Sequence, residues 1–473
     1  MRRPFRISVM IVAIVLASLL GVSLTQAQQT DDSLSATGLT FQEANLPWNA
    51  QYAHQVDYPD DVGSYASLAL RPYDNLPYIS YYDSTNGDLM LAHLMPLGNG
   101  DCGTDNKWKC ERLDGDLIHG SDNVGSYTSI DFWADESNSA WRIGISYHDT
   151  TNRGLKYISW YCDILCTQHR IVTIDSTDIN LVSIGLYTSL KFGPTGEPNI
   201  VYYYSNSIGN DSLRYAYPVA SGGNCGEGSD EGEWQCDIID SGDRTGQYAS
   251  MDLTYDGTVY IAYYDRGLGN LKLANYWGII EDDCYLDNGW WCVELDSVGD
   301  VGMYASLAAQ HFPGDKLYRV AYYDATNEQL KYTDIDWDPL VVDDMGPDLS
   351  PMGISMDVDP DGAPIIAYKQ NTSEFGPPEL NIARPFFVYD DGNFGNCGDT
   401  PPGYIFLYWR CDTVDNGGQY LEVAEFVSIK LNPAGFANIA YSEFVNIDVG
   451  DHATSLKFIS QKAITFLPLI LKP

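Results

Sequence analysis

A unit that recurs seven times along the chain constrains the fold more than any other feature. The first copy, Val62 to Asp114, reads V-G-S-Y-A-S-L-A-L, then L-P-Y-I-S-Y-Y-D-S-T-N-G-D-L-M-L-A-H-L, then a cysteine loop ending in W-K-C-E-R-L-D. The serine of the first segment marks the copies, with spacings of 62, 60, 61, 56, 49 and 73 residues, at Ser67, Ser129, Ser189, Ser250, Ser306, Ser355 and Ser428. Such a period indicates repeated supersecondary units.

Each copy contains four short segments with strand composition, separated by turn residues. The second segment carries an Ile or Val, a small residue and then a tyrosine, and we expect these tyrosines to pack between neighbouring units: Tyr81, Tyr147, Tyr203, Tyr263, Tyr322, Tyr368 and Tyr441. In a strand the small residue lies on the opposite face from the tyrosine. Tyr202 is the exception, standing where the other copies have Ser or Ala.

Four strands repeated seven times predict an all-β fold, a seven-bladed β-propeller of four-stranded antiparallel blades. Separate sandwich domains would need about 100 residues each, more than these spacings allow. The seventh copy lacks its own fourth strand, and residues 48–57 resemble a fourth strand without a blade. We therefore expect this N-terminal strand to close the ring, with the apolar segment 464–471 as the competing candidate.

The N-terminus has the features of a secretory signal. Arg2, Arg3 and Arg6 precede an apolar run from Ile7 to Val22 and small residues up to Ala27. The predicted division is a signal peptide at 1–27, a linker at 28–47, the propeller at 48–462 and an apolar tail at 463–473. This run is shorter than the roughly 20 residues of a membrane span, so we expect a secreted or cell-surface protein without a transmembrane segment.

The chain is strongly acidic. Its net charge is -39, and cleavage after Ala27 would make it -42 because three arginines and no acids are removed. Such a surface repels phosphate backbones and anionic lipids, which excludes nucleic acid as a partner. Neutral sugars, cations and basic partners remain, although acidity alone can also serve solubility.

Ten cysteines fall into five close pairs. An even count of this kind in an exported chain predicts local disulfides rather than a metal site. The expected pairs are Cys102 with Cys110, Cys162 with Cys166, Cys225 with Cys236, Cys284 with Cys292, and Cys397 with Cys411. All of them lie between third and fourth strands.

The loops of a propeller define two faces. What we call the first face gathers the loops from fourth to first strands and from second to third strands, and the second face gathers the others, including the cysteine loops. Acids and tyrosines recur on the first face, where a ring of them around a central opening could bind a sugar or Ca²⁺. The repeated acids are Asp83, Asp149, Asp265 and Asp324 at strand ends, with Asp60, Asp61, Asp122, Asp178, Asp243, Asp300 and Asp348 in the loops.

A residue repeated in most blades usually does something that every blade needs, and an Asp at a strand end can accept the N–H groups of its own turn. We expect turn bracing by these aspartates, with a serine such as Ser67 donating to the Asp. Unique sites should instead lie where the repeat is broken. The candidate ligand-binding residues are Tyr82, Asp83, His148, Asp149, Asp265, Arg266, Asp324 and Lys369.

His148 and Lys369 replace a tyrosine of the repeat, and Arg266 follows Asp265. A histidine such as His148 could act as a general base and is the one catalytic candidate. No G-x-S-x-G, H-E-x-x-H or P-loop motif is present in the sequence.

Three loops resemble shortened Asp-box motifs, S-x-D-x-G-x-x-W in full. They are Thr104 to Trp108, Ser229 to Trp234 and Asp287 to Trp291. On these motifs the chain is similar to the sialidase-like, BNR-repeat propellers. Sialidases of that group bind the substrate carboxylate with three arginines, whereas the first strands here contain none and the F-R-I match at Phe5 to Ile7 lies in the signal peptide. The resemblance therefore implies a member without sialidase activity.

These observations favour an exported, monomeric binding module for carbohydrate or another extracellular ligand. The alternatives are a glycan-active lyase or hydrolase on the same fold, and a structural or adhesive surface protein. An enzyme should gather unlike polar residues in one pocket, whereas a lectin should repeat similar shallow sites between blades.

Overall fold

The computed structural model describes residues 53–461, with gaps at 58–59, 96–97, 116–121, 136–138, 164–165, 208, 227–232, 277–283, 285–288, 311, 347–352, 372–377, 388–394, 400–406, 418–420 and 449–450. The chain divides into two units, Met1–Asn45 and Leu46–Pro473, and the described residues all belong to the second. The predicted signal peptide, the linker and the apolar tail lie outside the described residues. The part of the chain that is described contains no helix long and apolar enough to cross a membrane.

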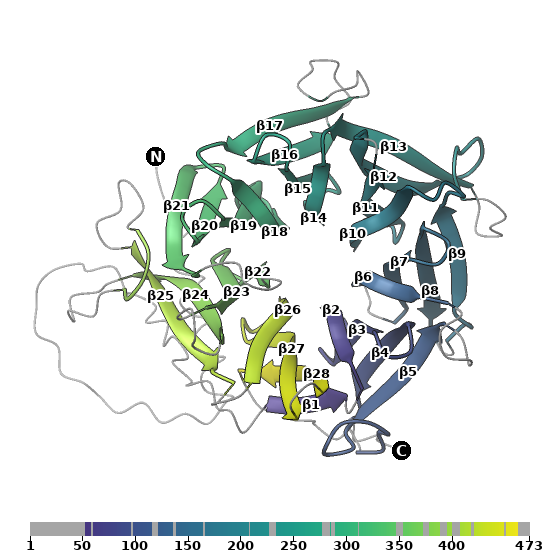
Figure 1. Ribbon diagram of the computed structural model, residues 1–473, viewed down its shortest axis with the longest axis horizontal. Helices are drawn as coiled ribbons and strands as arrows, with labels where there is room; N and C mark the ends of the chain where they lie inside the picture. The colour runs from purple at the N-terminus through teal and green to yellow at the C-terminus, as the bar shows by residue number, and fades with distance from the viewer. Residues whose placement is uncertain are drawn as a thin grey trace, which may run out of the picture. The chain divides into compact units, whose positions relative to one another are not determined.

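The second unit is a ring of seven sheets around a central axis, each with four antiparallel strands (Figure 1). The innermost strands are β2 (Val62–Leu70), β6 (Val124–Ala134), β10 (Val182–Phe192), β14 (Thr245–Leu253), β18 (Val301–Ala309), β22 (Ile354–Val358) and β26 (Leu421–Leu431). The second strands are β3 (Pro77–Asp83), β7 (Trp141–Asp149), β11 (Pro198–Asn206), β15 (Val259–Asp265), β19 (Tyr318–Asp324), β23 (Pro364–Gln370) and β27 (Ala437–Asp448). The seven-bladed propeller is confirmed.

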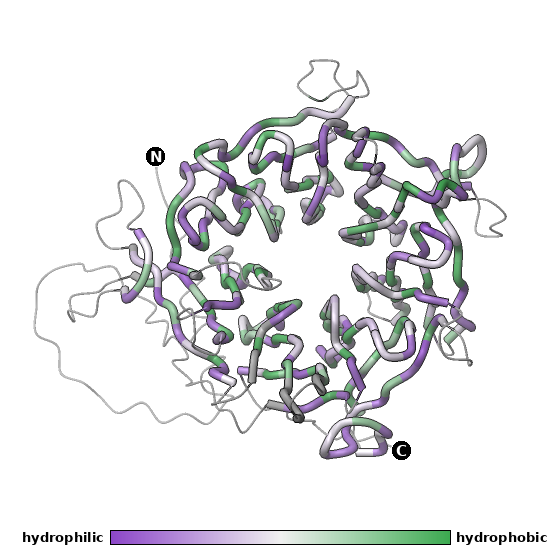
Figure 2. Tube along the Cα trace, in the orientation of Figure 1, coloured by the Kyte–Doolittle hydropathy of each residue, from purple (hydrophilic) through white to green (hydrophobic). Residues whose placement is uncertain are grey.

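The outer half of each blade consists of its third and fourth strands. The third strands are β4 (Asp88–Leu94), β8 (Gly154–Cys162), β12 (Asp211–Val219), β16 (Asn270–Tyr276), β20 (Gln329–Asp334), β24 (Glu379–Phe387) and β28 (Asp451–Ser460). The fourth strands are β5 (Trp108–Asp114), β9 (Arg170–Asp175), β13 (Glu233–Gly242), β17 (Trp290–Asp296), β21 (Trp337–Asp344), β25 (Leu407–Asp415) and, in the seventh blade, β1 (Ala53–Asp57). Figure 2 shows hydrophobic and hydrophilic residues interspersed along the strands of every blade. The second strand β15 is buried along its whole length, because both of its faces pack against other residues.

The ring closes through the N-terminal strand, as predicted. β1 pairs antiparallel with β28, with Ala53 opposite Ile459 and His54 opposite Phe458. Figure 1 shows β1 and β28 side by side in the seventh blade. The closing strand begins at Ala53 rather than Trp48, and the competing segment 464–471 lies outside the described residues.

The marker serines connect adjacent blades in an unbroken circuit. The hydroxyl oxygen of each marker serine accepts a hydrogen bond from a backbone N–H of the next blade. The donor is the residue directly after the marker serine of that next blade, and the N···O distances are 2.9 to 3.2 Å. The prediction that Ser67 donates to Asp83 is wrong. Ser67 lies opposite Ser80 and accepts the N–H of Ile130, because its side chain points out of the sheet toward the next blade.

A tyrosine–aspartate hydrogen bond joins each blade to the one before it. The phenol of the second strand donates to the aspartate near the end of the preceding fourth strand, in all seven interfaces: Tyr81 to Asp57, Tyr147 to Asp114, Tyr202 to Asp175, Tyr263 to Asp240, Tyr322 to Asp296, Tyr368 to Asp343 and Tyr441 to Asp415. A hydrogen bond to a charged acceptor contributes about 1.5–3 kcal/mol. The prediction of interblade packing is therefore confirmed.

One residue assignment within that series is wrong. In the third blade the donor is Tyr202, not Tyr203, and Val201 rather than Tyr202 lies opposite the marker Ser189. The three consecutive tyrosines 202–204 hid this one-residue shift, which moves every side chain to the other face. With the register corrected, the third blade obeys the same pattern as the others.

The V-G-x-Y segment that opens a blade reflects a close approach between blades. Gly125 has φ +110°, and an added Cβ would lie 2.7 Å from the Cα of Leu89 in the preceding blade. Gly63, Gly185, Gly246 and Gly302 occupy equivalent places against the third strand of the preceding blade. Only glycine permits both this conformation and this contact.

A tryptophan at the start of the fourth strand fills the space between two blades in most of the ring. We call it the wedge residue. Trp108 packs edge-on against Phe458, Trp234 against Tyr157, Trp290 against Tyr215 and Trp409 against Tyr332, each partner lying on the third strand of the preceding blade. These four wedge residues are at most 3% exposed.

All five predicted disulfides are present: Cys102–Cys110, Cys162–Cys166, Cys225–Cys236, Cys284–Cys292 and Cys397–Cys411. All five lie at the connection between the third and fourth strands, on the second face, and four of them reach the fourth strand. The exception is Cys162–Cys166, which ends before β9. Crosslinks across 4 to 14 residues of sequence contribute about 2–3 kcal/mol each in the chain-entropy model.

Candidate functional site

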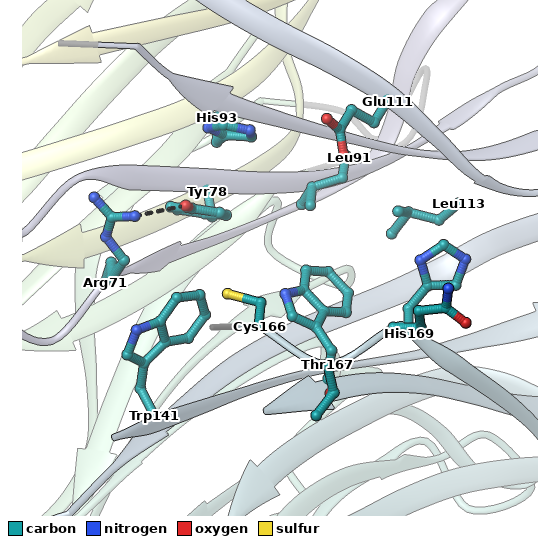
Figure 3. Close-up of a pocket in the computed structure, with 12 residues that line it drawn as sticks. Arg71, Tyr78, Leu91, His93, Glu111, Leu113, Trp141, Cys166, Thr167 and His169 are labelled. Atoms are coloured by element: carbon teal, nitrogen blue, oxygen red, sulfur yellow. Dashed lines mark hydrogen bonds between the residues drawn. The ribbon is translucent and has the colours of Figure 1, made fainter. Parts of the chain in front are cut away.

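A cavity of about 590 Å³ lies between the first blade (β2 to β5) and the second blade (β6 to β9), toward the second face (Figure 3). Its lining combines apolar and aromatic side chains with basic, acidic and amide groups, so that it can offer both stacking surfaces and hydrogen-bonding groups to a small molecule. The lining residues are Arg71, Tyr78, Leu91, His93, Glu111 and Leu113 from the first blade, and Trp141, Trp160, Cys166, Thr167, Gln168 and His169 from the second.

This cavity exists because the second blade lacks a wedge tryptophan. In the first blade Ala92 pairs with Cys110, which lies two residues after Trp108. The equivalent pair in the second blade is Ile158 with Ile171, which lies two residues after His169. His169 therefore occupies the wedge position. Its imidazole is smaller than an indole and is exposed, so the space beside Leu91 and Leu113 stays open.

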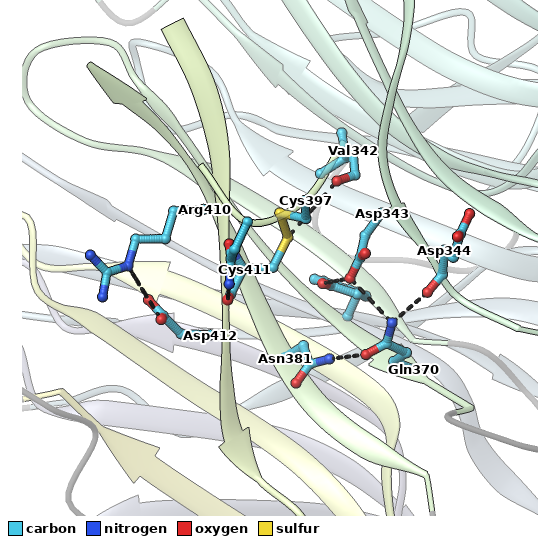
Figure 4. Close-up of a disulfide and its surroundings, with 11 residues drawn as sticks. Val342, Asp343, Asp344, Gln370, Asn381, Cys397, Arg410, Cys411 and Asp412 are labelled. Carbon is cyan, nitrogen blue, oxygen red and sulfur yellow. Dashed lines mark hydrogen bonds and ion pairs between the residues drawn. A yellow bond between two sulfur atoms is a disulfide. The ribbon is translucent and has the colours of Figure 1, made fainter. Parts of the chain in front are cut away.

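The cysteine loop of the second blade is also too short to cover the gap. Elsewhere this loop reaches the fourth strand of the preceding blade, with Gly226 N–H donating to the Ile174 carbonyl at 2.7 Å and Asp399 N–H to the Val341 carbonyl at 2.8 Å. Figure 4 shows the Cys397–Cys411 disulfide beside Val342 of that strand. The Cys162–Cys166 loop spans only four residues and folds back on its own blade, where Thr167 N–H donates to the Tyr161 carbonyl at 2.8 Å.

The wall contributed by the first blade is preorganised. Tyr78 stacks on His93, with ring centroids 4.9 Å apart and 9° between the planes. Arg71 donates to the Tyr78 hydroxyl at 2.9 Å and forms an ion pair with Asp74 at 2.6 Å. Burial raises the pKa of Tyr78 to about 12 and lowers that of His93. At neutral pH this wall therefore presents a protonated phenol and an uncharged imidazole.

The opposite wall presents two partly exposed indoles. The ring centroid of Trp141 lies 5.6 Å from that of Phe132, and the ring centroid of Trp160 lies 6.4 Å from that of His169. Figure 3 shows Trp141 and His169 on the side of the cavity opposite Tyr78 and His93. Glu111 and Gln168 are exposed at its edge. The arrangement offers aromatic surfaces for stacking and polar groups for hydroxyl recognition.

The strand-end aspartates that the sequence singled out lie on the first face, not in this cavity. Asp83, Asp149, Asp265 and Asp324 are at most 5% exposed. Asp83 accepts the backbone and side-chain N–H groups of Asn86 at 3.1 and 2.7 Å, and Asp149 and Asp324 hold Asn152 and Asn327 in the same way. Asp265 accepts the Leu268 N–H at 3.3 Å. Turn bracing is confirmed for these four aspartates.

Two of the predicted loop acids, Asp61 and Asp300, also hold the first face together through their side chains. Asp61 Oδ1 accepts the Thr454 N–H at 2.9 Å, and Tyr264 donates to Asp300. Asp348 lies outside the described residues. The described residues contain no cluster of three His, Cys, Asp or Glu side chains able to hold a metal ion.

The residues that break the repeat near that face are mostly interior. His148 is 3% exposed, its Nδ1 lies 2.8 Å from the Ile184 carbonyl, and burial lowers its pKa. Lys369 is fully buried, 3.5 Å from Glu425. Tyr82 donates to Asn123 at 2.9 Å, and Arg266 is exposed. A ligand-binding or catalytic role for these four residues stays a prediction.

A second, smaller cavity of about 210 Å³ lies on the axis. It is ringed by the residues two positions before the marker serines, which are Tyr65, Tyr127, Tyr187, Tyr248, Tyr304, Gly353 and Phe426. Neighbouring aromatic rings are 4.4 to 4.8 Å apart, and burial raises the pKa of Tyr65 and Tyr187 far above its ordinary value. Because each ring packs against its neighbours, the aromatic faces are already occupied.

Sequence reasoning missed the interblade cavity and the residues that form it. One signal was available: the second copy alone has both cysteines before its fourth strand and no W-x-C group, while Trp141 and Trp160 have no counterpart in the first copy. The expectation that sites lie where the repeat is broken pointed to the second copy, but to His148 on the first face.

No family model matches the chain, and no curated protein matches it. Solved structures that resemble it include a Hadza microbial sialidase, with 10% identity over 85% of this chain and 65% of that one, at a TM-score of 0.42. A fucose-specific lectin from Aleuria aurantia shares 13% identity over 74% of this chain and all of that one, at 0.41. A polysaccharide lyase shares 11% sequence identity over 86% of this chain and 91% of that one, at a TM-score of 0.38. Identities this low speak at most to the fold, which the sheet topology already establishes.

Proposed function

We propose that this protein is an exported glycan-binding propeller and that the cavity between its first and second blades holds a neutral sugar. The observation that carries the proposal is the pair of partly exposed indoles, Trp141 and Trp160, opposite a polar wall. Indole faces stack on the apolar faces of sugar rings, and a few fixed polar groups then select the hydroxyl pattern. Five disulfides fit an oxidising, extracellular setting.

Charge favours a neutral ligand over an acidic one. Arg71 is the guanidinium of the cavity, and Asp74 already neutralises it at 2.6 Å. His93 is uncharged at neutral pH, because burial lowers its pKa. Glu111 adds a negative charge at the edge, and the whole chain carries -39. Among the described residues that line the cavity, none offers an unpaired guanidinium or ammonium group to a uronate or sialate.

The same lining gives little support to hydrolysis. Glycosidases generally use two carboxyl groups about 5 to 9.5 Å apart. Glu111 is the one carboxylate among the described residues that line the cavity. Binding is therefore the function that these residues support best, and it agrees with the resemblance to non-sialidase members of the BNR-repeat propellers.

The experiment is a glycan array on the mature protein, with and without Ca²⁺, followed by calorimetry on the variants Trp160→Ala and Trp141→Ala. Each substitution should weaken binding about 30-fold, corresponding to the roughly 2 kcal/mol of a buried aromatic anchor. Trp133→Ala is the matched control, since Trp133 lies on the second blade outside the cavity and donates to the Pro194 carbonyl at 3.1 Å. Array signal only with acidic glycans, or unchanged affinity in both cavity variants, would contradict the proposal.

A further inference from the structure

We infer that the interface between the third blade (β10 to β13) and the fourth blade (β14 to β17) carries a second, shallower glycan subsite. The inference rests on the proposed function, because it assigns the same ligand chemistry to another pair of blades. It arises from residue positions that the register of the strands makes equivalent in the two interfaces.

The strand pairings identify these positions. Leu91 pairs with Glu111 in the first blade, and Tyr215 pairs with Asp237 in the third, so Asp237 corresponds to Glu111. Two residues further along the third strand, Tyr217 corresponds to His93.

On the next blade, Leu155 pairs with Asp175 and Leu271 with Asp296. Five residues after each leucine stand Trp160 and Tyr276. Both interfaces thus place an acid on the fourth strand, a polar aromatic ring on the third strand and an aromatic ring on the neighbouring blade.

The side chains at the second interface form one continuous aromatic surface. Tyr276 is 53% exposed, and its ring centroid lies 5.5 Å from that of Trp290. Trp290 packs against Tyr215 at 5.3 Å, and Tyr215 lies 5.4 Å from Tyr217. An exposed tyrosine at the end of such a surface supplies a stacking platform without any rearrangement.

Polar groups adjoin that surface. Gln235 donates to Asp237 Oδ1 at 2.7 Å. The pKa of Tyr217 is raised, mainly by burial and also by the neighbouring Asp237 carboxylate. Its phenol therefore stays protonated and is held beside the Asp237 carboxylate by a side-chain hydrogen bond. A carboxylate, an amide and a phenol beside an aromatic platform repeat the recognition chemistry of the first cavity.

No other interface has this combination among the residues that the structure describes. At each of the other five interfaces we compared three positions, on the third strand, the fourth strand and the next blade. In that order, starting from the interface between the second and third blades and continuing around the ring, the residues are Ser159, Val172 and Pro218; Asn275, Val293 and Ile335; Asp334, Leu340 and Pro385; Arg384, Asp412 and Gln461; and Ser460, His54 and Leu94. None of these sets places aromatic rings on both blades. The pattern is therefore specific to two of the seven interfaces.

The two subsites differ in depth. Trp290 fills the space that His169 leaves open, and it is 3% exposed. The second subsite is therefore a surface platform, and its affinity for a short sugar should be the lower of the two. On one polysaccharide chain the two subsites act together, which raises avidity by about 10² or more when the spacing allows both to engage.

Hydroxyl-radical footprinting tests this inference on the intact mature protein. The probe is a mixture of neutral oligosaccharides from mannan, xylan and β-1,3-glucan. We expect protection at Trp141 and Trp160 and, at higher probe concentration, at Tyr217 and Tyr276. Protection of the tryptophans alone would overturn the second subsite and leave the proposed function standing. No protection at either interface would overturn both.

Binding to immobilised forms of the same polysaccharides gives the second readout. Tyr276→Ala should lower apparent affinity on the polysaccharide surface about 10-fold or more, while affinity for the short oligosaccharides at the first cavity stays unchanged. Tyr255→Ala is the matched control, because Tyr255 is 51% exposed on the same blade and lies outside the cluster. Equal behaviour of the two variants would overturn the inference.

Discussion

Two neighbouring interfaces, one between the first and second blades and one between the second and third, differ at the wedge position and in the cysteine loop beside it. In the second of these, Trp234 packs against Tyr157 and is 1% exposed, and its cysteine loop donates from Gly226 to Ile174. In the first, His169 stands at the wedge position and the loop is shortened. One interface is sealed and the other holds a cavity of about 590 Å³.

The difference shows that stacking and recognition draw on different residues. The serine circuit and the tyrosine–aspartate bonds are complete at both interfaces, so the blades keep their spacing whether or not the wedge is present. A substitution at the outer wedge can then open a cavity without loosening the ring.

The largest expected effect is on stability, and it separates the two wedge positions. Trp234→Ala should lower the free energy of unfolding by about 3–5 kcal/mol, as for other buried tryptophans. His169→Ala should change it by no more than about 0.5 kcal/mol, because the imidazole is exposed. Urea denaturation of both variants measures the contrast. Similar costs would show that His169 also supports the interface.

Restoring the wedge should abolish the difference. His169→Trp is expected to fill the cavity beside Leu91, to raise stability by about 0.5–2 kcal/mol and to reduce glycan affinity at least 30-fold. His169→Gln, which keeps a polar side chain of moderate size, is the control. The combination of retained affinity and increased stability would show that ligands do not enter beside the wedge.

The smallest effect is the pH dependence contributed by His148. Burial lowers its pKa in the folded state, so the imidazole is neutral there while the unfolded chain is protonated below about pH 6.5. Its contribution to stability is therefore complete above about pH 6.5. As the pH falls from there to the lowered pKa, the free energy of unfolding decreases by about 1.4 kcal/mol per pH unit.

The variant His148→Tyr carries the tyrosine that the third and fourth copies have at this position, Tyr203 and Tyr264. It has no imidazole at position 148, so the protonation of that group is removed. Thermal unfolding between pH 5 and 8 should show a smaller loss of stability in acid for the variant than for the native chain. His93, whose pKa is lowered in the same direction, is present in both proteins and cancels from the comparison. Identical pH profiles would show that His148 is not protonated on unfolding in this range.

Much of the fold was predictable because it repeats. The blade number, the four-strand unit, closure by β1, the five disulfides and the interblade role of the tyrosines all follow from features that recur or pair locally in the chain. Local ambiguity caused the errors. Three consecutive tyrosines concealed the register of the third blade, and the partner of Ser67 lies on a different blade from the one considered.

The positive φ angles of the axial aromatic residues were also beyond sequence reasoning. Tyr65, Tyr127, Tyr187, Tyr248, Tyr304 and Phe426 have φ between 49° and 55°. Such a conformation costs an L-residue roughly 1–2 kcal/mol, so the sequence alone gives no reason to expect it. Contacts with neighbouring rings around the axis compensate it, and those contacts exist only once the ring has closed.

The sequence by itself determined the architecture, because a seven-fold period with strand alternation leaves few ways to bury its apolar faces. It also identified the second copy as a place where the repeat fails. Only the tertiary structure decided what that failure produces. Arg71, His93, Glu111, Trp160 and His169 are separated by up to 98 positions and share no local motif. They meet because blades stack side by side, and the cavity between them is set by the volume that a missing indole leaves.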